Sequence, residues 1–178
     1  MDEIQTGMGR TGALFCYENY GITPDIFTLA KALGGGVPIG AVCAKDEIAA
    51  AFEPGDHGTT FGGNPLATAA GLAVFEVMDS EHLAENAKTV GRYLKEALVA
   101  LTARYPVIEE VRGMGLMLGV AFNKPIAKAV QKALFNEKYL VGAVGDSLLR
   151  LAPPLIINQT EADAFVKALE AALSAVTE

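Results

Sequence analysis

Asp2 and Lys31 are the two residues whose types and positions first suggest chemistry. Lys31 directly follows an apolar run at residues 26–30, and Asp2 would follow a strand that is absent or truncated in this chain. Ligands of open α/β sheets bind at the carboxyl ends of strands. The 28 residues between Asp2 and Lys31 allow a loop, a short helix around Tyr17 and a return to the same sheet. The sequence therefore predicts an acid and an amine that face one crevice.

Such a pair is what pyridoxal phosphate requires of a protein. The lysine bonds to the aldehyde of the cofactor, and the carboxylate keeps the pyridine nitrogen protonated so that the ring can accept electrons. Alone, Lys31 would be read as a solvated surface residue. Its apolar neighbours and the three glycines at 34–36 instead favour a desolvated lysine beside a close backbone approach. A desolvated amine is a usable nucleophile and base near neutral pH.

The glycines at positions 7, 9 and 12 form G-x-G-x-x-G, the spacing of a dinucleotide-binding loop. That motif needs an apolar strand before the first glycine and a helix after the third. The residues before Gly7 are Met-Asp-Glu-Ile-Gln-Thr, and no convincing helix cap follows Gly12. A turn whose glycines permit positive φ is the better interpretation, and a nicotinamide dehydrogenase is a weak alternative.

Composition excludes several classes of partner. With 21 acidic and 14 basic residues, the net charge is −7 and no basic stripe appears, so nucleic acid and anionic membranes are poor partners. Cys16 and Cys43 lack metal-ligand spacing and are interpreted as reduced thiols in or near the core. No apolar run is long enough to span a bilayer, and we expect a cytoplasmic protein without a bound metal.

The first half of the chain predicts two strands and two helices. The apolar runs at 26–30 and 39–44 suit strands of a parallel sheet that is buried on both faces. Residues 64–79 are apolar nearly all round and predict a deeply buried helix with Pro65 at its first position. Residues 81–104 predict an amphipathic helix, which we take as the domain boundary.

After residue 105 the pattern alternates between short strands and helices. It predicts strands near 115–122, 139–144 and 148–151, a helix near 126–136, and a closing helix from about Glu161. Thr160 is the expected N-cap of that last helix, with Asp163 in the capping-box neighbourhood.

Six stretches in the same order and spacing make the sequence similar to the C-terminal half of the class III (subgroup II) pyridoxal-phosphate aminotransferases. They are residues 2–12 (DEIQTGMGRTG), 24–25 (PD), 28–36 (TLAKALGGG), 57–65 (HGTTFGGNP), 111–115 (VRGMG) and 149–154 (LRLAPP). The resemblance implies an α/β fold. Residues 1–80 would be the C-terminal part of the large domain of a fold type I enzyme, 81–104 a connecting helix, and 105–178 a small α+β domain.

The resemblance also assigns roles to five residues. Asp2 corresponds to the carboxylate that pairs with the pyridinium nitrogen, and Gln5 to the side chain near the phenolic oxygen of the cofactor. Lys31 corresponds to the Schiff-base lysine. Thr60 corresponds to the threonine that reaches the cofactor phosphate across the interface of a homodimer. Arg150 corresponds to the arginine that binds the substrate α-carboxylate, for which a two-pronged guanidinium is suited.

Each assignment beyond the acid and the lysine has a structural alternative. Gln5 could be an ordinary loop residue, and Thr60 could cap the helix that begins at Pro65. Arg150 could be a solvated charge at a strand end. Arg112 is interpreted as structural, because nothing in its spacing points to the crevice.

The activity implied is transfer of an amino group from a small-molecule donor to a 2-oxo acid. The residues at 8–12 and 59–63 lean toward enzymes of arginine biosynthesis that use acetylornithine and 2-oxoglutarate. Relatives that act on ornithine, succinylornithine or 4-aminobutyrate stay open as alternatives.

Members of the family are considerably longer, so we expect this chain to be a fragment that lacks the phosphate-binding loop and the aromatic residue that stacks on the cofactor ring. A non-catalytic dimerisation or binding remnant, built on the part from about residue 105, is the alternative from another functional class.

Overall fold

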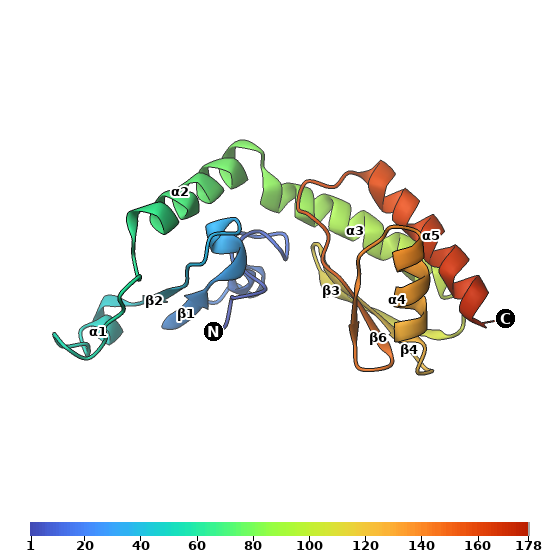
Figure 1. Cartoon of the computed structure of the whole chain (residues 1–178), viewed down its shortest axis with the longest axis horizontal. Helices are drawn as coiled ribbons and strands as arrows, with labels where there is room; N and C mark the ends of the chain where they lie inside the picture. The colour runs from blue at the N-terminus through green and yellow to red at the C-terminus, as the bar shows by residue number, and fades with distance from the viewer. Residues whose placement is uncertain (178) are drawn as a thin grey trace. The chain divides into compact units, whose positions relative to one another are not determined.

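The computed structural model describes residues 1–177, and it divides into two compact units. Unit 1 is Met1–Glu85 and unit 2 begins at Asn86. Helix α3 (Leu83–Leu101) crosses the division, as can be followed along the chain in Figure 1.

Unit 1 contains a two-stranded antiparallel sheet of β1 (Ile26–Leu29) and β2 (Ala41–Ala44), in which Phe27 pairs with Cys43. The prediction that these two strands lie parallel and fully buried is wrong. A parallel return needs a long crossover connection. The connection here holds only η2 (Lys31–Gly34), a 3₁₀ turn, and Val42 remains 69% exposed.

Two further short elements belong to the first part of unit 1. The expected short helix around Tyr17 is confirmed as η1 (Cys16–Tyr20), a 3₁₀ helix, and α1 (Asp46–Ala49) follows β2. Phe15, Tyr17 and Phe27 pack together with ring centroids 5.1 to 5.7 Å apart. Both cysteines are half-buried and free.

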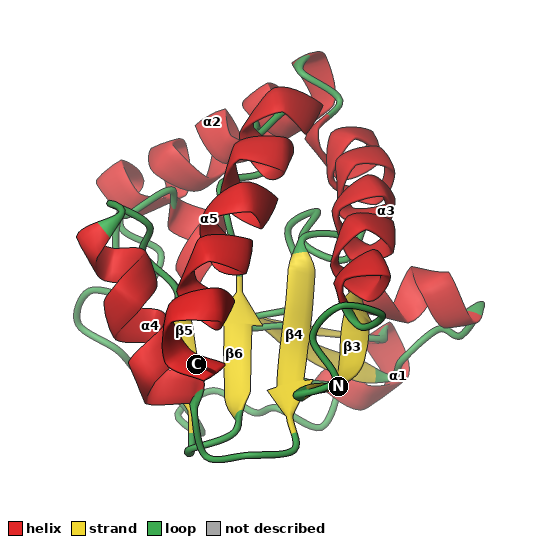
Figure 2. Ribbon diagram, turned by 90° about the vertical axis from the view of Figure 1, so that its right-hand side faces the viewer, coloured by secondary structure: helices red, strands yellow, loops and turns green. Residues whose placement is uncertain are grey.

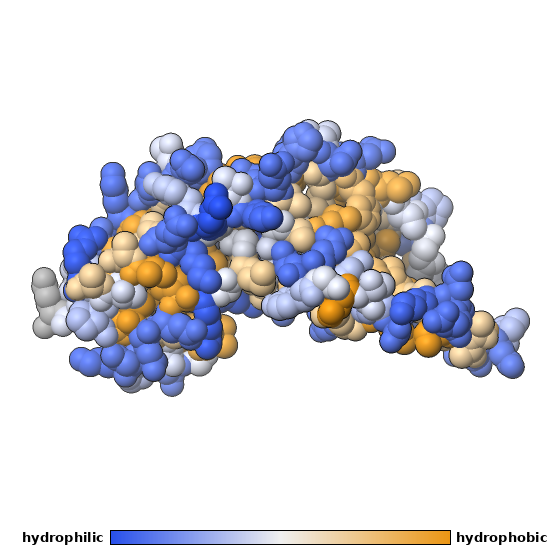
Figure 3. Space-filling view, turned by 180° about the vertical axis from the view of Figure 1, so that it is seen from behind, coloured by the Kyte–Doolittle hydropathy of each residue, from blue (hydrophilic) through white to orange (hydrophobic). Residues whose placement is uncertain are grey.

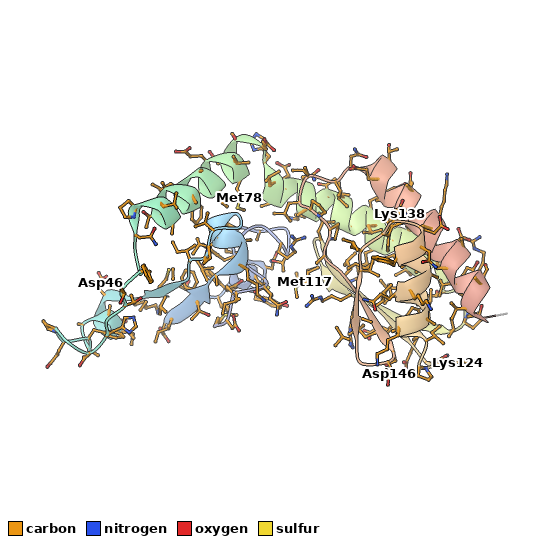
Figure 4. All side chains as sticks on the ribbon, in the orientation of Figure 1. Asp46, Met78, Met117, Lys124, Lys138 and Asp146 are labelled. Atoms are coloured by element: carbon orange, nitrogen blue, oxygen red, sulfur yellow. The ribbon has the colours of Figure 1, made fainter. Side chains whose placement is uncertain are left out.

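Helix α2 (Pro65–Ser80) begins as predicted, with Pro65 in its first turn and Asn64 as the N-cap. The Oδ1 atom of Asn64 accepts a hydrogen bond from the Ala67 N–H at 3.0 Å, so Thr60 does not cap this helix. Met78, labelled in Figure 4, belongs to a small core with Leu29 and Leu33.

Deep burial of α2 was predicted and is wrong. Leu66 is 73% exposed and Leu72 is 65% exposed, because α2 packs on η2 through one face only. Figure 3 shows apolar side chains gathered at the surface over α2.

The amphipathic helix predicted at 81–104 is confirmed as α3, although it is shorter at both ends. Its apolar face is fully buried at Ala87, Leu94 and Leu98. Close packing is enforced at Gly91, where an added Cβ would lie 2.1 Å from the carbonyl oxygen of Gly115. The start of α3 is tied to the chain after the last strand, since the Asn86 amide donates to the carbonyl oxygens of Leu155 and Ile157.

Unit 2 is an antiparallel sheet with helices on one face. The strands are β3 (Ile108–Met114), β4 (Met117–Phe122), β5 (Gly142–Val144) and β6 (Leu148–Leu151), in the order β3-β4-β6-β5. Helices α3, α4 (Ala127–Asn136) and α5 (Gln159–Thr177) lie in front of the sheet in Figure 2. Alternate residues of β4, namely Leu118, Val120 and Phe122, are buried, as a sheet with one covered face requires.

Three details of the second half differ from the predictions. Strand β3 was not predicted, because two glutamates and a glycine interrupt its apolar pattern. The strand expected from residue 139 begins only at Gly142. Thr160 is not the N-cap of α5. Instead Asn158 Oδ1 accepts from the Glu161 N–H at 3.0 Å, and the Glu161 carboxylate accepts from the Asn158 N–H at 2.9 Å, a reciprocal capping box.

Candidate active site

The first residues of the chain run parallel to β1. Asp2 forms a parallel bridge with Thr28, whose N–H donates to the Met1 carbonyl and whose carbonyl accepts from the Glu3 N–H, each at 3.0 Å. The Asp2 carboxylate is exposed, and its Oδ1 accepts from the Ile4 N–H at 2.9 Å. The backbone and one carboxylate oxygen of Asp2 are therefore both fixed.

Lys31 lies three residues beyond the bridged Thr28, at the first position of η2. Because the two bridged segments are parallel, the residues after Asp2 and after Thr28 leave this bridge at the same end. Lys31 has a φ of 49°, the left-handed region that non-glycine residues rarely occupy. Strained backbone of this kind is concentrated at functional sites.

The prediction that Lys31 is desolvated is wrong for the described chain. The residue is exposed, and only the residues that follow it, Leu33 and Gly34, are buried. The apolar residues around Lys31 therefore indicate that η2 is buried, and do not indicate that the Lys31 amine is buried.

The glycine loop, residues 7–12, is held by backbone hydrogen bonds within itself and to the residues next to it. The Gly9 N–H donates to the Leu14 carbonyl and the Gly12 N–H to the Gly9 carbonyl, each at 3.0 Å. Gly9 and Gly12 have φ values of 79° and 91°, while a Cβ at Gly7 would lie 2.8 Å from the Glu3 carbonyl oxygen. A phosphate-binding loop presents its N–H groups to the ligand. These N–H groups are used internally, which supports the turn interpretation over the dinucleotide one.

Glu3 is a buried acid that the sequence analysis missed. It is 1% exposed, and its carboxylate accepts from the Thr6 hydroxyl and from the N–H groups of Cys16 and Tyr17. Two of these donors are backbone groups, which carry no side-chain signal in the sequence. The position of Glu3 beside Asp2 in a glycine-rich turn was the only available indication.

Gln5 and Thr60 occupy different parts of unit 1. Gln5 is exposed in the same turn as Asp2. Thr60 is exposed on the segment between α1 and α2, and no hydrogen bond joins its hydroxyl to Asp2 or Lys31 within residues 1–177. Asp2 is thus bridged to Thr28 of β1, Gln5 follows Asp2 in the next turn, and Lys31 begins the turn η2 shortly after β1, while Thr60 lies on a separate segment.

Arg150 lies in unit 2 on the face of the sheet opposite to the helices. Its neighbours along β6, Leu149 and Leu151, point into the core, so the exposed Arg150 points the other way. It pairs with Gly119 of β4 on one side and Gly142 of β5 on the other. Because Gly142 has no side chain, the Arg150 side chain lies over it, with Nε 3.5 Å from where a Cβ of residue 142 would be. Gly119 also pairs with Arg112 of β3, so both arginines lie in one row across the sheet, a relation that the sequence spacing did not reveal.

Burial changes the pKa of two groups near the glycine loop. It lowers the pKa of Arg10 and raises the pKa of Tyr17, to which the carboxylates of Glu18 and Glu3 add a smaller increase. No cluster of three metal-ligating side chains exists in the described part of the chain. Among those same residues, none of the helices has the length and apolar character needed to span a bilayer.

Comparison with known proteins shows which family the chain belongs to. The family model described as "Aminotransferase class-III" matches residues 1–173. The chain is 50% identical over 171 residues to acetylornithine aminotransferase of Gloeobacter violaceus, covering 96% of this chain and 42% of that protein. It is 51% identical over 171 residues to the enzyme of that name from Methanocaldococcus jannaschii, covering 95% of this chain and 42% of that protein.

Solved structures agree. Acetylornithine aminotransferase from Elizabethkingia anophelis superimposes with a TM-score of 0.92 at 36% identity, covering 97% of this chain and 44% of that one. An ornithine aminotransferase from Plasmodium yoelii superimposes with a TM-score of 0.93 at 35% identity, covering 98% of this chain and 47% of that one. The fold is thus the mixed α/β fold of these transferases, and the chain belongs to the class-III aminotransferases. It spans less than half the length of the curated relatives it matches.

Class-III aminotransferases are pyridoxal-phosphate enzymes, and the donor set of unit 1 fits that cofactor. A carboxylate, an amide and an amine are what the ring nitrogen, the phenolic oxygen and the aldehyde need. Asp2, Gln5 and Lys31 have side chains of these three types, on two segments that the parallel bridge between Asp2 and Thr28 joins.

Proposed function

We propose that this chain is part of a pyridoxal-phosphate-dependent aminotransferase that moves the terminal amino group of acetylornithine to 2-oxoglutarate, a step of arginine biosynthesis. The observation that carries the proposal is the parallel bridge between Asp2 and Thr28, which sets the acid and Lys31 at the same end of two adjacent segments. The identity to acetylornithine aminotransferases supports the choice of donor.

In this proposal the cofactor, when bound, supplies an aldehyde and an electron-accepting ring. The Asp2 carboxylate holds the ring nitrogen in its protonated form. The Lys31 amine would hold the cofactor at its aldehyde, and in its free form would move a proton to and from the donor carbon. Gln5 donates a hydrogen bond toward the phenolic oxygen.

The remaining assignments concern the substrate and the assembly. Arg150 binds the substrate carboxylate through two parallel N–H groups, from a position between Gly119 and Gly142 on the sheet face opposite to the helices. Thr60 reaches the cofactor phosphate of a second subunit, which makes the enzyme a homodimer and accounts for the separation of Thr60 from Asp2 within one chain. We assign unit 1 to the large cofactor domain, unit 2 to the small domain, and the protein to the cytoplasm.

The test joins this chain, at Met1, to the N-terminal part of the Gloeobacter violaceus relative that the match leaves uncovered. The joined protein is mixed with pyridoxal phosphate, reduced with borohydride and digested for mass spectrometry. We expect the reduced cofactor on the peptide that contains Lys31, and its loss in Lys31→Ala.

Lys45→Ala is the matched control, because Lys45 is the only other lysine of unit 1 and pairs with Asp25 on the surface. It should keep the labelled Lys31 peptide. A folded joined protein that carries no label at Lys31, or that labels Lys45 equally, would overturn the proposal and favour the non-catalytic remnant.

A further inference from the structure

The proposed reaction gives no task to Glu3, although Glu3 is the most deeply buried acid of the described chain. Its Oε2 accepts from the Thr6 hydroxyl at 2.6 Å and from the Cys16 N–H at 3.0 Å, while its Oε1 accepts from the Tyr17 N–H at 2.9 Å. A buried carboxylate is tolerated only where hydrogen-bond donors replace the lost water. Three donors converge here, so this part of unit 1 is built around the charge.

The hydrogen bonds of Glu3 join the two ends of the glycine loop. Cys16 and Tyr17 begin η1, whose first N–H groups have no partner within the helix and favour a negative charge. At the other end of the loop, the Gly7 N–H donates to the Glu3 carbonyl at 2.9 Å. The segments before and after the loop are therefore both hydrogen-bonded to Glu3.

Glu3 also limits the directions that Asp2 can take. The Glu3 N–H is fixed to Thr28, and its side chain is fixed in the interior, while the adjacent Asp2 is exposed. The next amide along the chain, Ile4 N–H, donates to the Asp2 carboxylate. Rotation of the Glu3 backbone would move both the Asp2 side chain and the donor that holds it.

We propose that Glu3 is a positioning residue: its buried carboxylate, held by Thr6 and the start of η1, fixes the direction in which Asp2 presents its own carboxylate to the cofactor ring. We call this restraint of Asp2 by the buried Glu3 the clamp. The effect on the cofactor rests on the proposed function, whereas the clamp does not.

The clamp is tested on the 178-residue chain alone by amide hydrogen exchange in NMR. Glu3→Gln keeps the shape but has one acceptor oxygen, and its NH₂ would face an N–H donor. We expect the Cys16 and Tyr17 amides, and also the Ile4 amide, to exchange roughly tenfold faster, as for one lost buried hydrogen bond. Faster exchange at Cys16 and Tyr17 with an unchanged Ile4 would show that Glu3 holds the loop only, and would overturn the proposal.

Two further variants complete this test. Glu18→Gln is the control, because the exposed Glu18 carboxylate also accepts from the start of η1, at 3.4 Å from the Phe15 N, and should leave Ile4 unchanged. Thr6→Val removes one donor and keeps the carboxylate. It should accelerate Ile4 to a smaller extent, and it decides the question if Glu3→Gln does not fold.

The effect on the cofactor is read in the joined protein. Glu3→Gln should shift the absorption band of the bound cofactor in the same direction as Asp2→Asn, and lower kcat by roughly tenfold to a hundredfold without changing KM. In the Asp2→Asn background it should produce no further band shift. Additive shifts would show that Glu3 does not act through Asp2. Absence of cofactor binding by the unaltered joined protein would count against the proposed function, and the exchange result on Ile4 would still decide the clamp.

Discussion

The two units differ most in how much apolar surface they bury. In unit 2, one connected core of twenty buried residues fills the space between the sheet and α3, α4 and α5. In unit 1, the connected core has four buried residues, Met8, Leu29, Leu33 and Met78. Large apolar side chains such as Phe61 and Leu66 are 80% and 73% exposed there. The candidate cofactor residues thus belong to the unit with the smaller core.

This difference separates stability from chemistry along the chain. Unit 2 has the buried area that holds a domain together, since hydrophobic burial is the dominant favourable contribution to folding. Unit 1 has specific hydrogen bonds around Asp2 and Glu3 but presents apolar surface of the kind that proteins use for contacts with other chains or segments. We therefore expect substitutions of equal chemistry to have unequal effects in the two units.

The largest difference is expected for leucine truncation. Leu98 of α3 is 0% exposed and Leu72 of α2 is 65% exposed, and both lie within helices. Leu98→Ala should lower the free energy of unfolding of unit 2 by about 2–5 kcal/mol, through lost burial and a residual cavity. Leu72→Ala should change that of unit 1 by less than about 0.5 kcal/mol.

Native-state hydrogen exchange measures both quantities, because it reports the opening of each unit separately. Equal losses for Leu98→Ala and Leu72→Ala would show that α2 is covered in solution and would remove the contrast between the units.

A second comparison uses the glycine in each long helix. A Cβ at Gly91 of α3 would lie 2.1 Å from the Gly115 carbonyl oxygen, whereas a Cβ at Gly71 of α2 would lie 3.4 Å from the Leu33 carbonyl oxygen. Gly91→Ala should cost about 1–3 kcal/mol, because backbone must move to relieve the overlap. Gly71→Ala should be neutral or stabilise by up to about 1 kcal/mol through helix propensity. Chemical denaturation followed by far-UV circular dichroism tests both, and stabilisation by Gly91→Ala would contradict the packing of α3.

The same contrast explains which parts of the fold could be predicted from the sequence. Helix α3 was predicted because the surface that covers its apolar stripe lies within the same unit, so periodicity and burial agree. Helix α2 was predicted as a helix, but its burial was not as expected, since an apolar composition does not identify the segment that covers it. The antiparallel pairing of β1 with β2 was missed because both parallel and antiparallel strands can be short apolar runs.

The candidate site shows the same limit. Asp2 and Lys31 were found because an acid and an amine have recognisable chemistry at strand ends. Glu3 was missed because its partners at Cys16 and Tyr17 are backbone N–H groups, which every residue type except proline carries. The row that joins Arg112 to Arg150 depends on strand register, and β3 itself was not predicted.

Helix caps give a third comparison, with a smaller expected difference. Asn64 caps α2 by one hydrogen bond, while Asn158 caps α5 through a reciprocal pair with Glu161. Asn158→Ala should cost about 1 kcal/mol, because the backbone N–H that bonds to the Glu161 carboxylate stays in place. Asn64→Ala should cost more, up to about 2 kcal/mol, because it removes the cap and also the hydrogen bond from the Asn64 amide to the Phe61 carbonyl oxygen. Hydrogen exchange in each helix tests the order, and a larger loss at Asn158 would contradict it.

The smallest effects are expected for two lysine–aspartate ion pairs on the surface, one taken from each unit. Lys45 and Asp25 lie 2.7 Å apart in unit 1, and Lys128 and Asp146 lie 2.7 Å apart in unit 2, where Asp146 is labelled in Figure 4. The hydrogen bond from each lysine, and then its charge, lowers the pKa of the paired aspartate.

A lowered pKa in the folded state means that the contribution to stability is present above the unfolded pKa. It is lost as the pH falls through the lower folded value, which lies below about pH 4. The carboxyl signals of both aspartates in a carbon-detected NMR titration should therefore titrate below the ordinary range, and Lys45→Met and Lys128→Met should each return only the paired aspartate to it. Because both pairs are exposed, neither substitution should change the stability at neutral pH measurably. A large loss for one pair alone would mean that its unit is held together by more than its apolar core.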